Sequence, residues 1–417
     1  MQIARSLSTL SRPALLGVSW FFCMGGLGIY FPYFGLYLKE NVGLPGIQVG
    51  LILGITPLVG LLAQPIWGQL ADRTGARTRL VALLAFGSAA GYMAYLGSER
   101  FAGLAVVTFG LALFNTALLP SLVAVSMALL RDLGPQAFGR ARAWGTVGFG
   151  VMVFGFPFLL TAYQEASELR AIEGGASEPG LELMFVVSAI WTAIGGIIAL
   201  CLPRSGAVSY RAKRGDWREL LRLSAYLRML LFTFLAYLFL QGPMTHFPNL
   251  VRHYGGSLES VSQMWLPMLA VEVPLVAFIG TALARFGARR VMGVAVFSAG
   301  VRWVIYGSAS ALWMIFGASF LHGVMVAGLM VGGPLYVESI VPEHLRSTAQ
   351  ALLATVGIGL GAGLSNVATG WLFESGGATA PYLVAGYGAM LLALALPVLI
   401  PREKNAWVHR ANVSGSE

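Results

Sequence analysis

A succession of long apolar runs constrains this chain more than any other feature of its sequence. A bilayer core about 30 Å thick is crossed by roughly 20 apolar residues in an α-helix. On that measure the sequence contains twelve spans, near residues 13–38, 46–71, 79–97, 102–130, 139–162, 181–202, 224–250, 259–284, 288–308, 311–337, 347–373 and 379–400. The predicted fold class is therefore an all-α membrane protein with twelve transmembrane helices.

The composition agrees with a membrane protein and excludes several other classes. Hydrophobic residues make up 57% of the chain and charged residues only 11%, which lies outside the usage of soluble globular proteins. The net charge of +9 is explained by basic loops, so a nucleic-acid partner is not expected. A catalytic triad, a metal-ligand spacing and a nucleotide-binding loop are all missing from the sequence. We therefore expect no enzyme activity, no metal and no cofactor.

The basic residues predict the orientation of the helices. If both termini face the cytoplasm, all but five of the 27 Lys and Arg residues fall on the cytoplasmic side. The five exceptions are Lys39, Arg100, Arg170 and Arg252 in the opposite loops and Arg302 inside a span. Such a skew follows the positive-inside rule. It predicts a multi-pass protein of the cell membrane, which is the inner membrane if the source is bacterial, with both termini in the cytoplasm.

The sequence is organised as two halves of six spans each. GQLADRTGAR at 68–77 matches GTALARFGAR at 280–289, and both stretches directly follow the second span of their half. A duplication of this kind is typical of transporters that bind substrate near the membrane midplane between the repeats. We predict two pseudo-symmetric six-helix bundles, 1–203 and 224–417, joined by a basic cytoplasmic linker at 204–223.

The loop after the second span resembles the signature of the major facilitator superfamily. The resemblance implies the major facilitator fold and transport by alternating access. In this loop Gly68 is expected to let helices approach closely, Gly75 to form a tight turn, and Asp72 to lie near the amino-terminal end of another helix. We interpret the loop as a cytoplasmic gate, although it could also be only a basic loop that sets topology. The predicted gate residues are Gly68, Asp72, Arg73, Gly75, Arg77, Arg285, Gly287, Arg289 and Glu338.

Glu338 needs separate mention among the gate residues. It lies at the cytoplasmic end of the tenth span, and it could form an ion pair with Arg346 or with the arginines of 285–290. Such a surface pair would add little stability, but it could bias the balance between two access states. Simple solvation is the alternative.

Four stretches resemble a narrower group of transporters, the one that contains lactose permease, phenylpropionate permease and the nucleoside-proton symporters. They are GIYFPYFGLYLKENVGL at 28–44, FGRARAWGTVGFG at 138–150, AVEVPLVAF with GVRW at 270–278 and 300–303, and LHGVMVAG at 321–328. The resemblance implies proton-coupled uptake of a small organic solute. It is incomplete, because the position of a carboxylate in the fourth span holds Ala124 and the place of a sugar-stacking aromatic holds Phe149. Arg142 is therefore either a substrate ligand or an interfacial anchor.

Three ionisable residues remain inside spans when all others are assigned to loops or helix ends. They are Glu272, Arg302 and His322, and His322 is the one histidine expected at depth. Ionisable groups in the bilayer cost at least about 2.5 kcal/mol each on insertion scales, so they face the bundle interior and find partners. At 1.5 Å per residue, the three residues lie at comparable depth on neighbouring helices.

These residues are the predicted site of proton coupling. Desolvation favours the protonated form of a glutamate, and a nearby arginine favours its charged form, so an arginine that moves between two states could make Glu272 bind and release a proton. One proton moving through about 100 mV supplies roughly 2.3 kcal/mol, which suffices for accumulation of several tens-fold. The alternative is a static network that holds three helices together.

Polar residues elsewhere in the spans are weaker candidates for the substrate cavity. They are Tyr30, Tyr33, Asn115, Arg142, Phe149, Gln241, Asn249 and Asn366. The function predicted from the sequence is proton-coupled symport of an aromatic acid, a sugar or a nucleoside by a monomer. Its expected partners are the small-molecule substrate, protons and the lipid bilayer, with the proton gradient as energy source. The alternatives are proton-driven efflux and a membrane sensor that does not transport.

Overall fold

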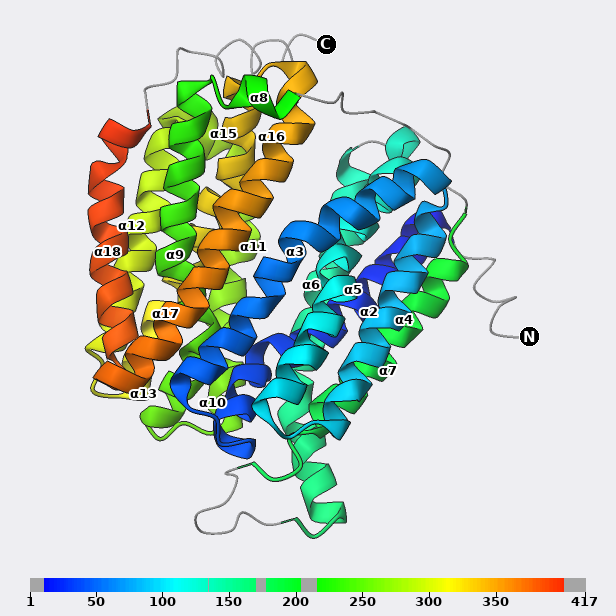
Figure 1. The fold of residues 1–417 in the computed structure, drawn as a ribbon, viewed down its shortest axis with the longest axis vertical. Helices are drawn as coiled ribbons and strands as arrows, with labels where there is room; N and C mark the ends of the chain where they lie inside the picture. Colours follow the sequence, from blue (N-terminus) through cyan, green and yellow to red (C-terminus); the bar gives the residue numbers. More distant parts are fainter. Residues whose placement is uncertain (1–10, 134, 170–177, 204–215, 401–417) are drawn as a thin grey trace. The chain divides into compact units, whose positions relative to one another are not determined.

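The computed structural model describes residues 11–133, 135–169, 178–203 and 216–400, without the side chains of residues 72, 135, 136, 216, 217 and 347 (Figure 1). The described part is built of helices, as the all-α prediction requires. It divides into two compact units, Met1–Tyr210 and Arg211–Glu417. The division falls inside the segment 204–223. Of this segment, the structure describes a short helix, α8 (Asp216–Leu220), and residues 221–223.

The first unit contains six long helices. They are α2 (Arg12–Leu36), which continues as the π-helical turn η1 (Tyr37–Asn41), α3 (Gly46–Thr74), α4 (Arg77–Ala94), α5 (Phe101–Leu129), α6 (Pro135–Ala166) and α7 (Leu183–Leu200). Each lies within a few residues of a predicted span.

The second unit also contains six spans, but two of them are interrupted. Continuous helices are α9 (Ser224–His253), α11 (Trp265–Phe286), which follows the short α10 (Leu258–Gln263), α12 (Ala288–Gly307) and α18 (Ala380–Leu399). The tenth span consists of α13 (Leu312–Ser319), α14 (Leu321–Met325), the π-helical segment η4 (Val326–Val331) and α15 (Gly332–Ile340). The eleventh consists of α16 (Arg346–Leu352), the π-helical segment η6 (Leu353–Leu360) and α17 (Gly361–Gly376).

Eleven helical segments of the described chain are long and apolar enough to cross a membrane. The remaining predicted span, near 288–308, is α12, which has 20 residues but includes Arg289, Arg290 and Arg302. The arginines lower its mean hydropathy, and its length still reaches about 30 Å at 1.5 Å per residue. The twelve-helix architecture is thus in place.

The two units pair their helices in the same order. In the first unit α2 packs along α6 and α7, α4 packs along α5 and α7, and α3 packs along α5. In the second unit α9 packs along α17 and α18, α12 packs along α14 and α18, and α11 packs along α14. Numbered within its unit, the first helix contacts the fifth and sixth, the third contacts the fourth and sixth, and the second contacts the fourth. The shared pattern is what a duplication produces.

Two glycines end equivalent helices of the two units. Gly75 follows α3 with φ +64°, and Gly287 follows α11 with φ +78°. Side chains disfavour positive φ, so both loop motifs use a glycine where the backbone turns with positive φ, although ψ is 2° at Gly75 and 148° at Gly287. The tight turn predicted at Gly75 is confirmed.

Candidate coupling and binding site

The second unit brings the three predicted coupling residues together. His322 on α14 lies between Glu272 on α11 and Arg302 on α12. The His322 Nε2 atom is 3.9 Å from Glu272 Oε2, and its Nδ1 atom is 2.9 Å from Arg302 Nη1. Arg302 is 1% exposed and His322 is 6% exposed. The imidazole thus contacts both the carboxylate and the guanidinium.

A glycine explains how α14 comes so close to α11. A Cβ atom at Gly323 would lie 2.6 Å from the carbonyl carbon of Val271 and would also meet the backbone nitrogen of Glu272. Only a residue without a side chain allows two helix backbones to meet in this way. The residue after His322 therefore brings the histidine within reach of the glutamate.

The partners of His322 define its protonation state. An arginine side chain has only hydrogen-bond donors, so Arg302 Nη1 donates and His322 Nδ1 accepts. The imidazole is then the neutral tautomer that carries its proton on Nε2, on the side of Glu272. A proton added to Nδ1 would break the bond to Arg302.

A directional chain of hydrogen bonds positions Arg302. Arg302 Nη2 donates to the Tyr306 hydroxyl at 3.1 Å. The Tyr306 hydroxyl is 2.6 Å from Ser319 Oγ, and Ser319 Oγ donates to the carbonyl of Ile315 at 2.8 Å. Because the serine proton is committed to that carbonyl, Tyr306 donates to Ser319 and accepts from Arg302. The chain links α12 to α13 and directs the guanidinium towards His322.

Aromatic rings and sulfur atoms surround the rest of the guanidinium. Its central carbon lies 4.4 Å from the ring centre of Trp303 and 4.9 Å from that of Tyr306. Nη2 also lies 3.7 Å from the sulfur atoms of Met244 and Met268. Cation–π contacts of this kind stabilise a desolvated cation by about 2 kcal/mol or more. These contacts enclose Arg302 and keep it out of contact with solvent.

Glu272 is the most accessible member of the cluster. Its side chain is 28% exposed, whereas His322 and Arg302 are enclosed. The order from accessible to enclosed is Glu272, His322, Arg302.

The two tyrosines predicted to line a cavity take part in the packing of the first unit. The Tyr33 hydroxyl donates to the carbonyl of Val153 at 3.0 Å, and the Tyr30 hydroxyl is 3.1 Å from that of Tyr95. Both tyrosines are buried, and their assignment to the cavity stays a prediction. Asn115 is half-buried and donates to the Tyr92 hydroxyl at 2.8 Å. Tyrosine and amide groups form the internal network because helix interfaces supply partners that lipid does not.

Arg142 and Phe149 lie on α6 and face α2. The Arg142 guanidinium carbon lies 4.8 Å from the ring centre of Trp20. Phe149 is buried, and its backbone packs against Gly28 on α2. The ring of Phe149 is thus part of the packing of the first unit rather than a free stacking surface.

The cavity candidates of the second unit gather on α9 and α17. Asn366 is buried, donates to the carbonyl of Ala362 at 3.0 Å and receives the Thr245 hydroxyl on Oδ1. Asn249 is buried and Gln241 is half-buried.

A second deep histidine, His246, lies among these residues and is 1% exposed. The prediction that His322 is the one histidine at depth was therefore wrong. His246 lies seven residues before the end of α9, and its position close to the end of a span concealed it.

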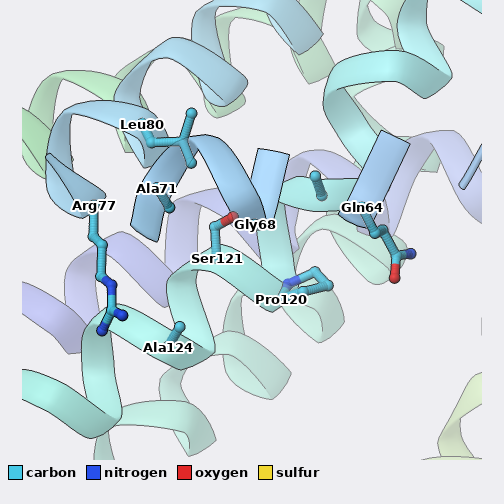
Figure 2. Close-up of a pocket in the computed structure, with 9 residues that line it drawn as sticks. Gln64, Gly68, Ala71, Arg77, Leu80, Pro120, Ser121 and Ala124 are labelled. Carbon is cyan, nitrogen blue, oxygen red and sulfur yellow. The ribbon is translucent and has the colours of Figure 1, made fainter. Parts of the chain in front are cut away.

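A hollow of about 240 Å³ lies in the first unit beside the gate loop (Figure 2). Gln64 lies at one end and Arg77 at the other, with Gly68 and Ser121 between them. Ala124 lines the same hollow. No described atom lies within 4 Å of a Cβ built at Gly68. The expectation of close helix packing at Gly68 was wrong, because its small size leaves the hollow open.

The other gate residues lie at loop ends of their units. Arg73 is exposed in the last turn of α3, and the side chain of Asp72 is outside the described residues. Arg285 is exposed at the end of α11 and contacts the Phe286 ring, and Arg289 Nη1 reaches the carbonyl of Ile400 at 3.4 Å.

Glu338 is exposed at the end of α15. In the part of the chain that the structure describes, no ion pair to Glu338 is found, so its expected pairing with an arginine is not seen. Its exposure leaves the carboxylate to be solvated by water.

Comparison with known proteins places these features in a family. The chain is 27% identical over 404 residues to maltose permease of Geobacillus stearothermophilus, covering 95% of this chain and 96% of that protein. It is 24% identical over 400 residues to a probable 3-phenylpropionic acid transporter of Escherichia coli, covering 93% and 97% of the two chains. The fold matches a crystal structure of a mutant of the nucleoside transporter NupG, with a TM-score of 0.81, 16% identity and coverage of 93% and 100%.

The model of the MFS_1 like family matches residues 14–384, which covers most of both units and all three residues of the coupling cluster. The relatives are membrane transporters rather than enzymes. With two six-helix units paired in the same order, the chain belongs to the MFS_1 like family and is a multi-pass transporter of the major facilitator superfamily.

Proposed function

We propose that this transporter is a proton-coupled symporter for a small organic solute. The observation that carries the proposal is the cluster of Glu272, His322 and Arg302, with its graded access from an exposed carboxylate to an enclosed guanidinium. Relatives named for maltose, for 3-phenylpropionic acid and for nucleosides support a small organic substrate. No cofactor is required, since the proton gradient supplies the energy.

In the proposed mechanism, Glu272 binds the transported proton. The ionised carboxylate attracts the Nε2–H group of His322, and the protonated carboxyl attracts it much less, because its charge is gone. The imidazole can then move relative to Arg302, which the chain through Tyr306 and Ser319 holds in place. Protonation thereby changes the packing of α11 against α14, and this pair of helices is the element that we expect to respond to the proton.

We further propose that the transporter is a monomer in the cell membrane, with both termini in the cytoplasm. The uneven distribution of Lys and Arg supports this orientation. In that orientation the loops at Gly75 and Gly287 face the cytoplasm and belong to the gate. Proton-driven efflux remains the alternative direction of transport, and the same cluster would serve it.

Replacement of Glu272 by glutamine tests the coupling. Glu272→Gln keeps the size of the side chain but removes its titratable group, so uphill accumulation of substrate is expected to vanish. Exchange of labelled for unlabelled substrate needs no net proton movement and is expected to persist. Both activities are measured in proteoliposomes, with and without an imposed proton gradient.

Glu259→Gln is the matched control for this experiment. Glu259 is an exposed acid in the first turn of α10, on the segment that leads into α11, and its loss is expected to leave both activities intact. Accumulation at the normal level in Glu272→Gln would remove this residue from the coupling mechanism. Loss of exchange as well as accumulation, with normal folding, would indicate a static brace or a substrate ligand.

A further inference from the structure

A polar cluster on α9 and α17, separate from the coupling residues, contains a buried histidine with one unpartnered nitrogen. Asn366 Oδ1 receives the Thr245 hydroxyl, and Ser365 Oγ accepts from the backbone nitrogen of Gly242 at 2.7 Å. His246 Nδ1 lies 3.0 Å from the carbonyl of Gly242. Within the described residues, His246 Nε2 has no hydrogen-bond partner.

The contact with Gly242 determines which nitrogen of His246 carries the proton. A carbonyl oxygen only accepts, so Nδ1 carries the proton and donates it. In the neutral ring, Nε2 then carries a lone pair and can only accept a hydrogen bond. This arrangement is the opposite of that at His322, where Nδ1 accepts and Nε2 carries the proton.

A second unpartnered acceptor lies one turn along the same helix. Asn249 is 8% exposed, and its Oδ1 atom has no partner among the described residues. Residues three apart on a helix share a face. A buried acceptor without a donor costs about 1–3 kcal/mol, so two acceptors in this region of α9 favour a ligand that supplies donors.

The acceptors select a chemical class of ligand. Hydroxyl groups of a sugar, or of the ribose of a nucleoside, can donate to Nε2 and Oδ1. An ionised carboxylate has only acceptors, so it could accept from the Asn249 amide but would meet only the lone pair of His246 Nε2, to which it cannot donate. A carboxylate also fails to reach Arg302, which rings, sulfur atoms and His322 enclose.

Helix α9 connects this polar cluster to the coupling residues. The Met244 sulfur contacts Arg302 Nη2, and Met244 is two residues before His246. Residues two apart in a helix point in nearly opposite directions. Helix α9 thus presents Met244 to Arg302 and His246 to Phe373 on α17.

We propose that His246 and Asn249 are the subsite for a neutral, hydroxyl-bearing solute, which donates hydrogen bonds to His246 Nε2 and Asn249 Oδ1. The substrate class follows as sugars or nucleosides rather than aromatic acids. This inference rests on the proposed transport function and names the substrate class of that transporter.

Binding to the purified full-length protein without a proton gradient tests the proposal. The probes are maltose, uridine and 3-phenylpropionate, and the readout is the ligand-dependent shift of the melting temperature. We expect at least one neutral probe to stabilise the wild type and 3-phenylpropionate to have no effect. His246→Phe keeps a ring but removes the acceptor, and it is expected to weaken binding by about tenfold or more.

Two further substitutions keep the test valid if His246→Phe does not fold. The glutamine of His246→Gln can place an acceptor near the position of Nε2, whereas the asparagine of His246→Asn can replace only Nδ1. Binding is expected to remain within a few-fold in the first variant and to be lost in the second. Thr233→Val is the matched control, because Thr233 Oγ1 is also buried and unpartnered on α9 but lies beside Gly357, about 20 Å away along the helix.

Three outcomes would overturn the proposal. The first is stabilisation by 3-phenylpropionate alone, and the second is that neither neutral probe stabilises the protein. The third is unchanged binding in both His246→Phe and His246→Asn, which would mean that Nε2 of His246 contacts only a structural water. Each outcome is independent of proton coupling, which the Glu272→Gln experiment measures separately. If transport is coupled to protons and the His246 variants bind the probes as the wild type does, the subsite is rejected and the transport function is not.

Discussion

Arg302 makes several different contacts with one side chain. Its two terminal nitrogens reach His322 and Tyr306, and its planar face lies over Trp303. A guanidinium can do all of this at once because it is flat and carries several donors in a fixed fork, whereas an ammonium group is a compact point charge.

Arg302→Lys is therefore expected to lose the coupling geometry although the charge is kept. Lysine cannot hold His322 and Tyr306 together, so proton-driven accumulation is expected to fall by about tenfold or more, in proportion to the loss of one buried charged hydrogen bond. Arg290→Lys, at an exposed position in the first turn of the same helix, is expected to transport normally. Accumulation by Arg302→Lys at the level of this control would show that charge alone is sufficient.

The residue scale also shows what a sequence can and cannot indicate about a site. Glu272, Arg302 and His322 could be predicted, because an ionisable group inside an apolar span is costly and therefore conspicuous. The position of His322 between the other two could not, because it depends on the contact of Gly323 with α11. His246 escaped prediction because it lies close to the end of a span and because its contacts are the carbonyl of Gly242 and the ring of Phe373 on the distant helix α17.

At the scale of elements, the least predictable features are the π-helical segments. Segment η4 begins four residues after His322, and η6 interrupts the eleventh span. An apolar run such as VAGLMV has the same hydropathy in either helix type, so neither periodicity nor length distinguishes them. Such segments occur frequently at functional sites, and η4 gives the tenth span a break next to the coupling histidine.

The loop motifs, in contrast, make a sharp prediction about four glycines. Gly75 has φ +64° and ψ 2°, in the left-handed region that other residues enter at a cost of about 1–2 kcal/mol. Gly287 has φ +78° and ψ 148°, close to a region that is essentially restricted to glycine. Gly68 and Gly280 lie within helices, with no described atom within 4 Å of a Cβ.

Alanine substitutions should therefore rank by backbone conformation. We expect Gly287→Ala to lower thermal stability most and Gly75→Ala less, while Gly68→Ala and Gly280→Ala serve as matched controls with little effect. Melting temperatures of the four purified variants provide the measurement. Equal losses at all four positions would show that these glycines matter for space or contacts rather than for positive φ.

At the scale of the whole molecule, the architecture was the most predictable part. Twelve apolar runs, a basic linker and a repeated loop motif indicated two six-helix bundles, and each unit indeed pairs its helices in the same order. The bilayer makes this possible, since it demands a long apolar helix at every crossing. What the runs do not encode is which polar side chains face one another within a bundle, since that depends on the rotation of each helix.

The orientation of the molecule in its membrane is a prediction that one experiment can decide. Cys201 is first replaced by serine. In this background Thr74→Cys places a thiol at the end of α3, and Ser308→Cys places one after α12. Both positions are exposed. Because α3 and α12 end on opposite sides in the topology proposed above, a membrane-impermeant maleimide should label Ser308→Cys in intact cells and Thr74→Cys only after permeabilisation. Buried Cys23 is expected to stay unlabelled and serves as the internal control. The reverse pattern would place the basic loops outside, contrary to the positive-inside rule, and Glu272 would then face protons from the opposite side of the membrane.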